Sequence, residues 1–218
     1  MIVVIASEKG GTGKTTVSTN LAVIRAQNAA DVLLIDADSQ RSAIDFATVR
    51  NLEGHHPELT CSSITGQGIG SELRKLAPKF DDIIVDVGGR DSSTLRSSLL
   101  VADVLVVPFI ASQFDTWGLE RMDSIVGDVL PLNERLRTIA FLNKVDTNPR
   151  IALAEEAINF AVELKHLTFL KAIMVGYRVA FRRSVADGMA VTELSKAKKD
   201  PKAIQEIINL YQEVFKDA

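Results

Sequence analysis

One stretch near the start of the chain decides the fold, and it reads Lys9-Gly10-Gly11-Thr12-Gly13-Lys14-Thr15-Thr16. A short β-branched run precedes it and a helical pattern follows it. Glycines between a strand and a helix let backbone N–H groups approach phosphate oxygens, and the helix N-terminus adds its positive dipole end. Lys14 is expected to reach the β- and γ-phosphates, and the Thr15 hydroxyl to coordinate Mg²⁺. The stretch therefore predicts a P-loop that binds a nucleoside triphosphate.

The rest of the chain alternates short apolar runs with longer segments of helical pattern. Nearly continuous apolar runs are typical of strands that are covered on both faces. The alternation predicts an α/β fold, with a mainly parallel sheet, helices on both faces and the P-loop NTPase architecture. A length of 218 residues suits one α/β domain, so residues 1–218 are expected to form a single P-loop ATPase domain. The expected strands are Ile2–Ala6, Val32–Asp36, Asp82–Val87, Asp103–Phe109, Thr138–Asn143 and Leu170–Val175, with one further short strand within Gly54–Gly70. The expected helices lie near 15–28, 41–53, 66–78, 91–101, 114–129, 149–165 and 201–216.

The composition narrows the class of protein. A net charge of −3 predicts no global attraction to nucleic acid, so any such binding must come from a local patch. The single cysteine, Cys61, cannot build a disulfide framework and fits a small buried side chain in a reducing cytoplasm. No apolar run approaches the roughly 20 residues that a membrane span needs, and no signal peptide is visible. We therefore expect a cytoplasmic protein with no membrane partner.

Three carboxylates are expected at the same edge of the sheet as the P-loop. Asp36 and Asp38 follow the second strand, two residues apart, and Asp86 ends the third. Ligands of such sheets sit beyond the carboxyl ends of the strands. Nucleotide hydrolysis needs a water held in line with the γ-phosphate, and strand-end acids of this class bind Mg²⁺. The alternative is a capping role, which suits Asp38 because a helix is expected to begin near Arg41.

The motifs together resemble the ParA/MinD family of deviant Walker A ATPases. The strict P-loop pattern has glycine at position 8, where this chain has Glu8 followed by a second lysine, Lys9. Asp36-Ala37-Asp38-Ser39-Gln40 is similar to the family's Asp-x-Asp-Pro-Gln, with Ser39 in place of proline. Ile83–Asp86, followed by Gly88-Gly89, resembles the family's Walker B and second switch. The likeness is closest to small plasmid-partition ParA proteins, because no DNA-binding extension precedes the first strand.

The resemblance implies specific roles. Asp38 would position the attacking water, while Thr15, Asp36 and Asp86 would lie around Mg²⁺. Lys9 would reach across a nucleotide-sandwich homodimer to the partner's phosphates, although an exposed surface lysine is the alternative. In the implied cycle, ATP closes the dimer and the dimer binds non-specific DNA on the nucleoid. A centromere-binding ParB-like partner then stimulates an ATPase that is slow alone.

The choice of base remains open between two interpretations of Asn143-Lys144-Val145-Asp146. These residues match the Asn-Lys-x-Asp motif with which GTPases recognise guanine. In that motif Asp146 would accept hydrogen bonds from the guanine base. ParA-like proteins instead tend to contact adenine through an asparagine here, which would be Asn143. The Lys9 loop favours ATP. The rival functions are a metabolic P-loop GTPase, an ATP-dependent ligase and a nucleotide-gated scaffold with negligible turnover.

The C-terminal third carries a basic segment and an amphipathic helix. Arg182 and Arg183 adjoin on one expected helix, so they cannot point the same way. The excess of basic over acidic residues in segment 171–202 suits contact with a phosphate backbone. The alternative is that these basic residues lie on solvated helix faces. The apolar stripe of the final helix, from Ile204 to Phe215, predicts core packing, because its polar face lacks the basic residues of a membrane-binding helix. Segment 171–202 contains three acidic residues and eight basic ones, which are Lys171, Arg178, Arg182, Arg183, Lys196, Lys198, Lys199 and Lys202.

Overall fold

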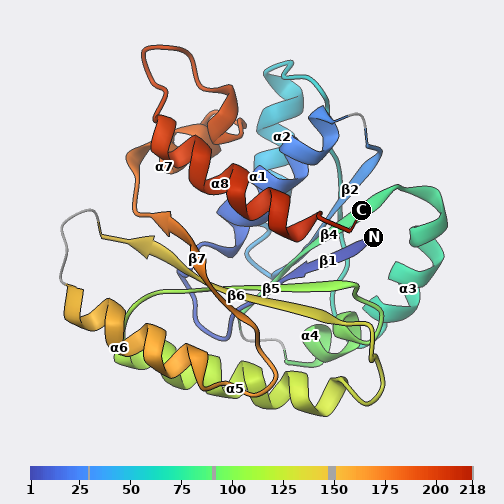
Figure 1. The fold of residues 1–218 in the computed structure, drawn as a ribbon. Helices are drawn as coiled ribbons and strands as arrows, with labels where there is room; N and C mark the ends of the chain where they lie inside the picture. The colour runs from blue at the N-terminus through green and yellow to red at the C-terminus, as the bar shows by residue number, and fades with distance from the viewer. Residues whose placement is uncertain (29, 90–91, 147–150, 218) are drawn as a thin grey trace.

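A seven-stranded sheet forms the centre of the molecule (Figure 1). The computed structural model describes residues 1–28, 30–89, 92–146 and 151–217. Every strand pair in these ranges is parallel, and the strand order is β3-β2-β4-β1-β5-β6-β7. The strands are β1 Ile2–Ile5, β2 Val32–Ala37, β3 Thr60–Ser63, β4 Asp82–Val87, β5 Val104–Phe109, β6 Arg137–Val145 and β7 Phe169–Gly176.

Helices cover both faces of the sheet, which confirms the predicted fold class (Figure 1). One face carries α1 Lys14–Gln27, α2 Ser42–Leu52, α7 Val179–Ala186 and α8 Pro201–Val214. The other face carries α3 Ile69–Leu76, α4 Ser92–Leu99, α5 Gln113–Val129 and α6 Ile151–Val162. Short 3₁₀ turns follow α3 at Ala77–Lys79 and α7 at Val191–Glu193.

The strand sequences explain the two layers. Val3 and Ile5 of β1 pack in the core on the α1 side, while Ile2 and Val4 pack in the core on the α5 side. Side chains alternate between faces along a strand, so a strand buried on both faces must be apolar throughout. The continuous apolar runs of the sequence follow from this double burial.

The order of the strands creates the crevice for the site. β1 lies between β4 and β5. Helix α1, which connects β1 to β2, covers one face of the sheet, and α4, which connects β4 to β5, covers the other face. In open parallel sheets, ligands bind where the crossovers diverge, beyond the carboxyl ends of the strands. The P-loop follows β1 and therefore lies at this position.

The last helix packs onto the sheet, as its apolar stripe predicted. Asp200 caps α8 by accepting hydrogen bonds from the backbone N–H groups of Lys202 and Ala203. Ile207, Leu210 and Val214 are buried in the same core as α1. No helix within the described ranges has the length and apolar character needed to cross a membrane.

Several boundaries differ from the expected ones. β6 continues two residues past Asn143, to Val145. α3 begins at Ile69 rather than 66, since Gly66 adopts a left-handed conformation in the preceding turn, and Pro78 turns its end into a 3₁₀ helix. Residues 91 and 149–150 of two expected helices lie outside the described residues.

Candidate nucleotide-binding site

The loop between β1 and α1 opens into a cleft of about 940 Å³. Gly11 and Gly13 have φ angles of 81° and 95°, a conformation that favours glycine, and α1 begins immediately afterwards at Lys14. Residues that follow β2, β3 and β4, together with Lys144 near the end of β6, complete the lining of the cleft. The predicted site residues that line it are Gly10, Gly11, Gly13, Lys14, Thr15, Thr16 and Asp38.

The end of β6 braces the P-loop. The Asn143 side-chain nitrogen donates to the Thr12 carbonyl oxygen at 2.6 Å, and its side-chain oxygen accepts from the Lys144 backbone N–H at 2.9 Å. The Lys144 ammonium donates to the Gly11 carbonyl oxygen at 2.6 Å. Asn143 is buried and Thr12 is fully buried. Both residues of the Asn143-Lys144 pair therefore hold the loop, a role that the sequence alone does not distinguish from base recognition.

Lys14 lies inside the cleft with little exposure to solvent. Its ammonium donates to the Lys9 carbonyl oxygen at 3.4 Å, and its side chain is buried. Burial lowers the pKa of Lys14, while the charges of Asp86 and Asp38 act against that shift. A partly desolvated ammonium between carboxylates is well placed to exchange them for phosphate oxygens.

Thr15 and Asp86 form the candidate Mg²⁺ site. The Thr15 hydroxyl donates to Asp86 Oδ2 at 2.6 Å, and Asp86 is only 1% exposed. Burial raises the pKa of Asp86 to about 7, although the hydrogen bond from Thr15 and the charge of Lys14 act to lower it.

The second oxygen of this carboxylate, Asp86 Oδ1, is buried and has no hydrogen-bond partner among the residues that the structure describes. Buried polar atoms normally have partners, so the orphaned oxygen fits a bound cation or its water. Within the described ranges, no cluster of three histidine, cysteine or acidic side chains could hold a metal by itself. Mg²⁺ commonly uses one or two carboxylates together with substrate phosphates, and the Thr15–Asp86 pair fits that pattern.

Asp36 and Asp38 have different surroundings. Asp36 is fully buried, and its carboxylate accepts from the backbone N–H groups of Asp38, Ala43 and Ile44 at 2.8–3.0 Å. Asp36 therefore caps α2, the role that the sequence suggested as an alternative for Asp38. Its place in the Mg²⁺ shell stays a prediction.

Asp38 is half-buried and lines the cleft. Its Oδ1 accepts from the backbone N–H of Gln40 at 3.0 Å. A Cβ on Gly88 would stand 2.9 Å from the Asp38 carboxyl carbon, and one on Gly89 would stand 3.0 Å from the Ser7 carbonyl oxygen. The two glycines thus let the loop after β4 approach both Asp38 and the start of the P-loop.

Lys9 points towards the loop between β5 and α5. Its ammonium donates to the Ser112 hydroxyl at 3.3 Å. Next to it, the Glu8 carboxylate pairs with the Arg121 guanidinium at 3.4 Å, so the non-glycine residue at position 8 has a partner on α5. The role of Lys9 in a dimer stays a prediction.

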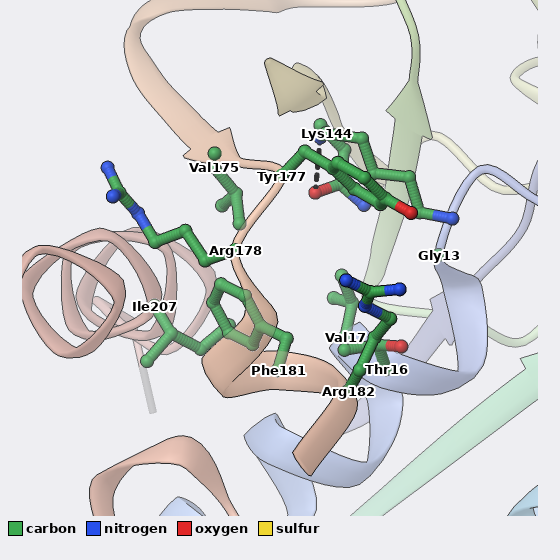
Figure 2. A pocket seen from close by; sticks show the side chains of 12 residues that line it. Gly13, Thr16, Val17, Lys144, Val175, Tyr177, Arg178, Phe181, Arg182 and Ile207 are labelled. Atoms are coloured by element: carbon green, nitrogen blue, oxygen red, sulfur yellow. Dashed lines mark hydrogen bonds between the residues drawn. The ribbon is translucent and has the colours of Figure 1, made fainter. Parts of the chain in front are cut away.

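A second, smaller pocket of about 110 Å³ adjoins the P-loop (Figure 2). Tyr177 follows β7 directly, and the Lys144 ammonium and Arg182 guanidinium lie 5.9 and 5.3 Å from the centre of its ring. Val17, beside the P-loop, supplies apolar lining, and the Asn143 side chain also borders the pocket. Tyr177 was not among the predicted site residues. Its position could have indicated it, because it is an aromatic residue immediately after the carboxyl end of a strand, where ligands of such sheets bind.

The basic segment has one structural member and several exposed ones. Arg178 is directed towards α8 in Figure 2, where its guanidinium binds the Glu206 carboxylate through two nitrogens. Lys198 pairs with Asp187 at 3.4 Å across an exposed surface. The exposed basic side chains are Lys171, Arg182, Arg183, Lys196, Lys198, Lys199 and Lys202.

Cys61 shows no sign of reactivity. It lies half-buried on β3, and burial raises the pKa of its thiol to about 12. The thiolate is the nucleophilic form, so this cysteine is inert near neutral pH.

Comparison with known proteins supports the nucleotide site. The family model described as the CobQ/CobB/MinD/ParA nucleotide binding domain matches residues 3–191. Maintenance of carboxysome distribution protein A of Halothiobacillus neapolitanus is 25% identical over 210 residues, which cover 94% of this chain and 93% of that protein. The chromosome-partitioning ATPase Soj of Thermus thermophilus is 27% identical over 167 residues, which cover 64% of this chain and 67% of Soj.

The fold is also similar to that of a solved structure. An ATP complex of a variant of Cyanothece McdA has a TM-score of 0.76 at 17% identity, covering 99% of this chain and 96% of that one. The family model includes the P-loop, all three carboxylates and Asn143. The chain therefore belongs to the CobQ/CobB/MinD/ParA family of nucleotide-binding domains.

Proposed function

We propose that this protein is a Mg²⁺-dependent ATPase of the ParA type, which uses ATP to position DNA or another cargo. The observation that supports hydrolysis most directly is the cleft itself. Lys14, which is largely buried, and Thr15 line it, and Thr15 donates to the buried Asp86, whose Oδ1 has no hydrogen-bond partner within the described ranges. A site that binds polyphosphate and Mg²⁺ needs both features.

The roles in hydrolysis follow from these positions. Lys14 binds the β- and γ-phosphates, and Thr15 and Asp86 would hold Mg²⁺, which neutralises phosphate charge when bound. Asp38, on the cleft wall, orients a water whose oxygen forms a bond to the γ-phosphorus. The bond from the γ-phosphorus to the bridging oxygen breaks, and ADP keeps the electron pair. The proton of the water is released with phosphate.

ATP is the proposed nucleotide. Asn143 and Lys144, the first half of the guanine-type motif, already bind the carbonyl oxygens of Thr12 and Gly11. The base is proposed to lie in the small pocket beside Tyr177, whose ring offers a stacking surface. The relatives also support adenine, since one is named an ATPase and another was solved with ATP. GTP is the alternative that the spelling of Asn143–Asp146 supports.

The proposed cycle includes a homodimer, DNA and a partner protein. Lys9 is proposed to reach the phosphates held by the second copy, since it starts the P-loop and its ammonium is directed towards Ser112, outside the lining of its own cleft. The exposed basic residues around α7 suit a non-specific DNA backbone. The names of the relatives refer to chromosome partitioning and carboxysome distribution, so the proposed cargo is a plasmid or a similar body in the cytoplasm, with a ParB-like protein as stimulator.

Steady-state hydrolysis of Mg-ATP and Mg-GTP by the purified protein, alone and with DNA, tests the proposal. We expect slow ATP turnover that DNA and the partner accelerate, and much weaker use of GTP. Lys14→Ala should abolish nucleotide binding, whereas Lys75→Ala, which removes an exposed ammonium on α3, should behave like the wild type. A clear preference for GTP would instead favour a metabolic GTPase and make Asp146 the base reader.

A further inference from the structure

Arg41 stands out among the residues after β2 because of its backbone. It precedes α2 with φ 57° and ψ 26°, in the left-handed region. Its backbone N–H donates to the Asp38 carbonyl oxygen at 3.1 Å, and its own carbonyl oxygen accepts from the Asp45 N–H at 3.1 Å. A residue with a Cβ is strained in such a conformation, and glycine would not be. Strain of this kind clusters at active sites, ligand clamps and switch regions.

Arg41 also borders the cleft of the candidate nucleotide-binding site. It lines that cleft together with Lys14 and Asp38, and it is exposed. Of the described residues that line this cleft, Arg41 alone carries a guanidinium. The structure gives this guanidinium no hydrogen bond or ion pair within the described residues, unlike Arg50, Arg121 and Arg178, which all pair with carboxylates.

We propose that Arg41 binds the terminal phosphate of the nucleotide held by its own chain. The proposal rests on the ATPase function proposed above and adds a residue to it. A guanidinium presents several donors in one plane and suits phosphate oxygens better than an ammonium does. As the water oxygen bonds to the γ-phosphorus and the bond to the bridging oxygen breaks, charge spreads over the γ-phosphate oxygens. Arg41 stabilises that charge, and its hydrogen bond to the Asp38 carbonyl couples it to the residue that orients the water.

The test uses Arg41→Gly, Arg41→Ala and Arg41→Lys. The glycine variant removes the guanidinium and also relieves the positive φ, so its thermal stability should equal or exceed that of the wild type. Its affinity for AMPPNP should fall about tenfold or more, while its affinity for ADP stays unchanged. Its kcat at saturating ATP should fall by about a hundredfold or more. Arg41→Lys should keep part of both effects, and Arg41→Ala should match glycine in binding and be less stable.

Two outcomes would overturn the assignment. One is an Arg41→Gly protein that keeps both the wild-type ratio of AMPPNP to ADP affinity and the wild-type kcat. The other is recovery of hydrolysis when Arg41→Gly is mixed with Asp38→Ala, since that result would place the guanidinium in the partner's site. The affinity ratio is measured without turnover, so it tests Arg41 even if the wild type hydrolyses no ATP, a result that would count against the ATPase proposal alone.

Discussion

The side-chain nitrogen of Asn143 lies 2.6 Å from the carbonyl oxygen of Thr12 and 2.5 Å from the position that a Cβ on Gly13 would occupy. The end of β6 and the P-loop thus touch with no space for another atom. The φ of 95° at Gly13 adds a second reason for glycine there. The shape of the phosphate loop depends on a residue that lies 130 positions away in the chain.

Gly13→Ala should therefore destabilise the protein even without nucleotide. Both the clash with Asn143 and the positive φ oppose the added methyl, so we expect the free energy of unfolding to fall by about 1–3 kcal/mol. Gly10→Ala is the matched control, because a Cβ at Gly10 would meet nothing within 4 Å. Denaturant unfolding of the two variants checks this, and equal stability would mean that the loop adapts freely.

Asp36→Ala and Asp38→Ala should separate stability from turnover. Loss of the buried Asp36 carboxylate leaves three backbone N–H groups without their acceptor, so unfolding should become easier by about 2 kcal/mol. Asp38→Ala should keep its fold and its ATP affinity but lose hydrolysis, because orienting the water matters only in the transition state. Calorimetry and a turnover assay decide the matter. Hydrolysis that survives in Asp38→Ala would remove this residue from catalysis.

Lys9→Ala should bind ATP as a folded monomer and fail to form the closed dimer. Its ammonium donates to the Ser112 hydroxyl at 3.3 Å, a contact that it can exchange for a partner's phosphate. Light scattering with ATP in the Asp38→Ala background measures the effect, because the nucleotide then stays intact. Lys75→Ala serves as the control. Dimerisation of the Lys9→Ala, Asp38→Ala double variant on ATP would take Lys9 out of the interface.

Much of the fold is predictable because both faces of the sheet are covered. Buried parallel strands must be apolar along their length, so β2 and β4 appear in the sequence almost at their true boundaries. The P-loop is predictable for a similar reason, since its glycines and Lys14 are dictated by local geometry. Helix α7 is harder to predict, because its eight residues are too few for a clear helical pattern, and the sequence indicated a helix only around Arg182–Arg183.

The contacts within the site are less predictable, because they join residues that lie far apart in the sequence and meet only in the folded chain. Asp36 and Asp38 both precede a helix, and only the structure shows that Asp36 caps it. Asn143 could bind either a base or the protein, and its hydrogen bond to Thr12 joins residues far apart in sequence. The positive φ of Arg41 could not be predicted from the sequence either, because arginine, unlike glycine, does not favour that conformation.

The exposed basic residues should govern DNA affinity without affecting nucleotide binding. Replacing Arg183, Lys196 and Lys199 by glutamate should weaken binding equally on any DNA sequence, because phosphate contacts carry no sequence information. Arg182 is left intact in this variant, since it also lines the pocket beside Tyr177. Basal ATPase activity is the control and should persist. Unchanged DNA affinity would place the DNA surface elsewhere on the molecule.

DNA affinity as a function of salt, measured on Asp38→Ala with ATP and again with ADP, tests the proposed cycle most directly. With ATP, the closed dimer presents two basic surfaces, so log affinity should fall linearly with log salt by about 0.9 for each phosphate neutralised. With ADP, binding should be much weaker and its slope shallower. Equal affinity with the two nucleotides, or no binding with ATP at low salt, would contradict an ATP-driven cycle carried on DNA.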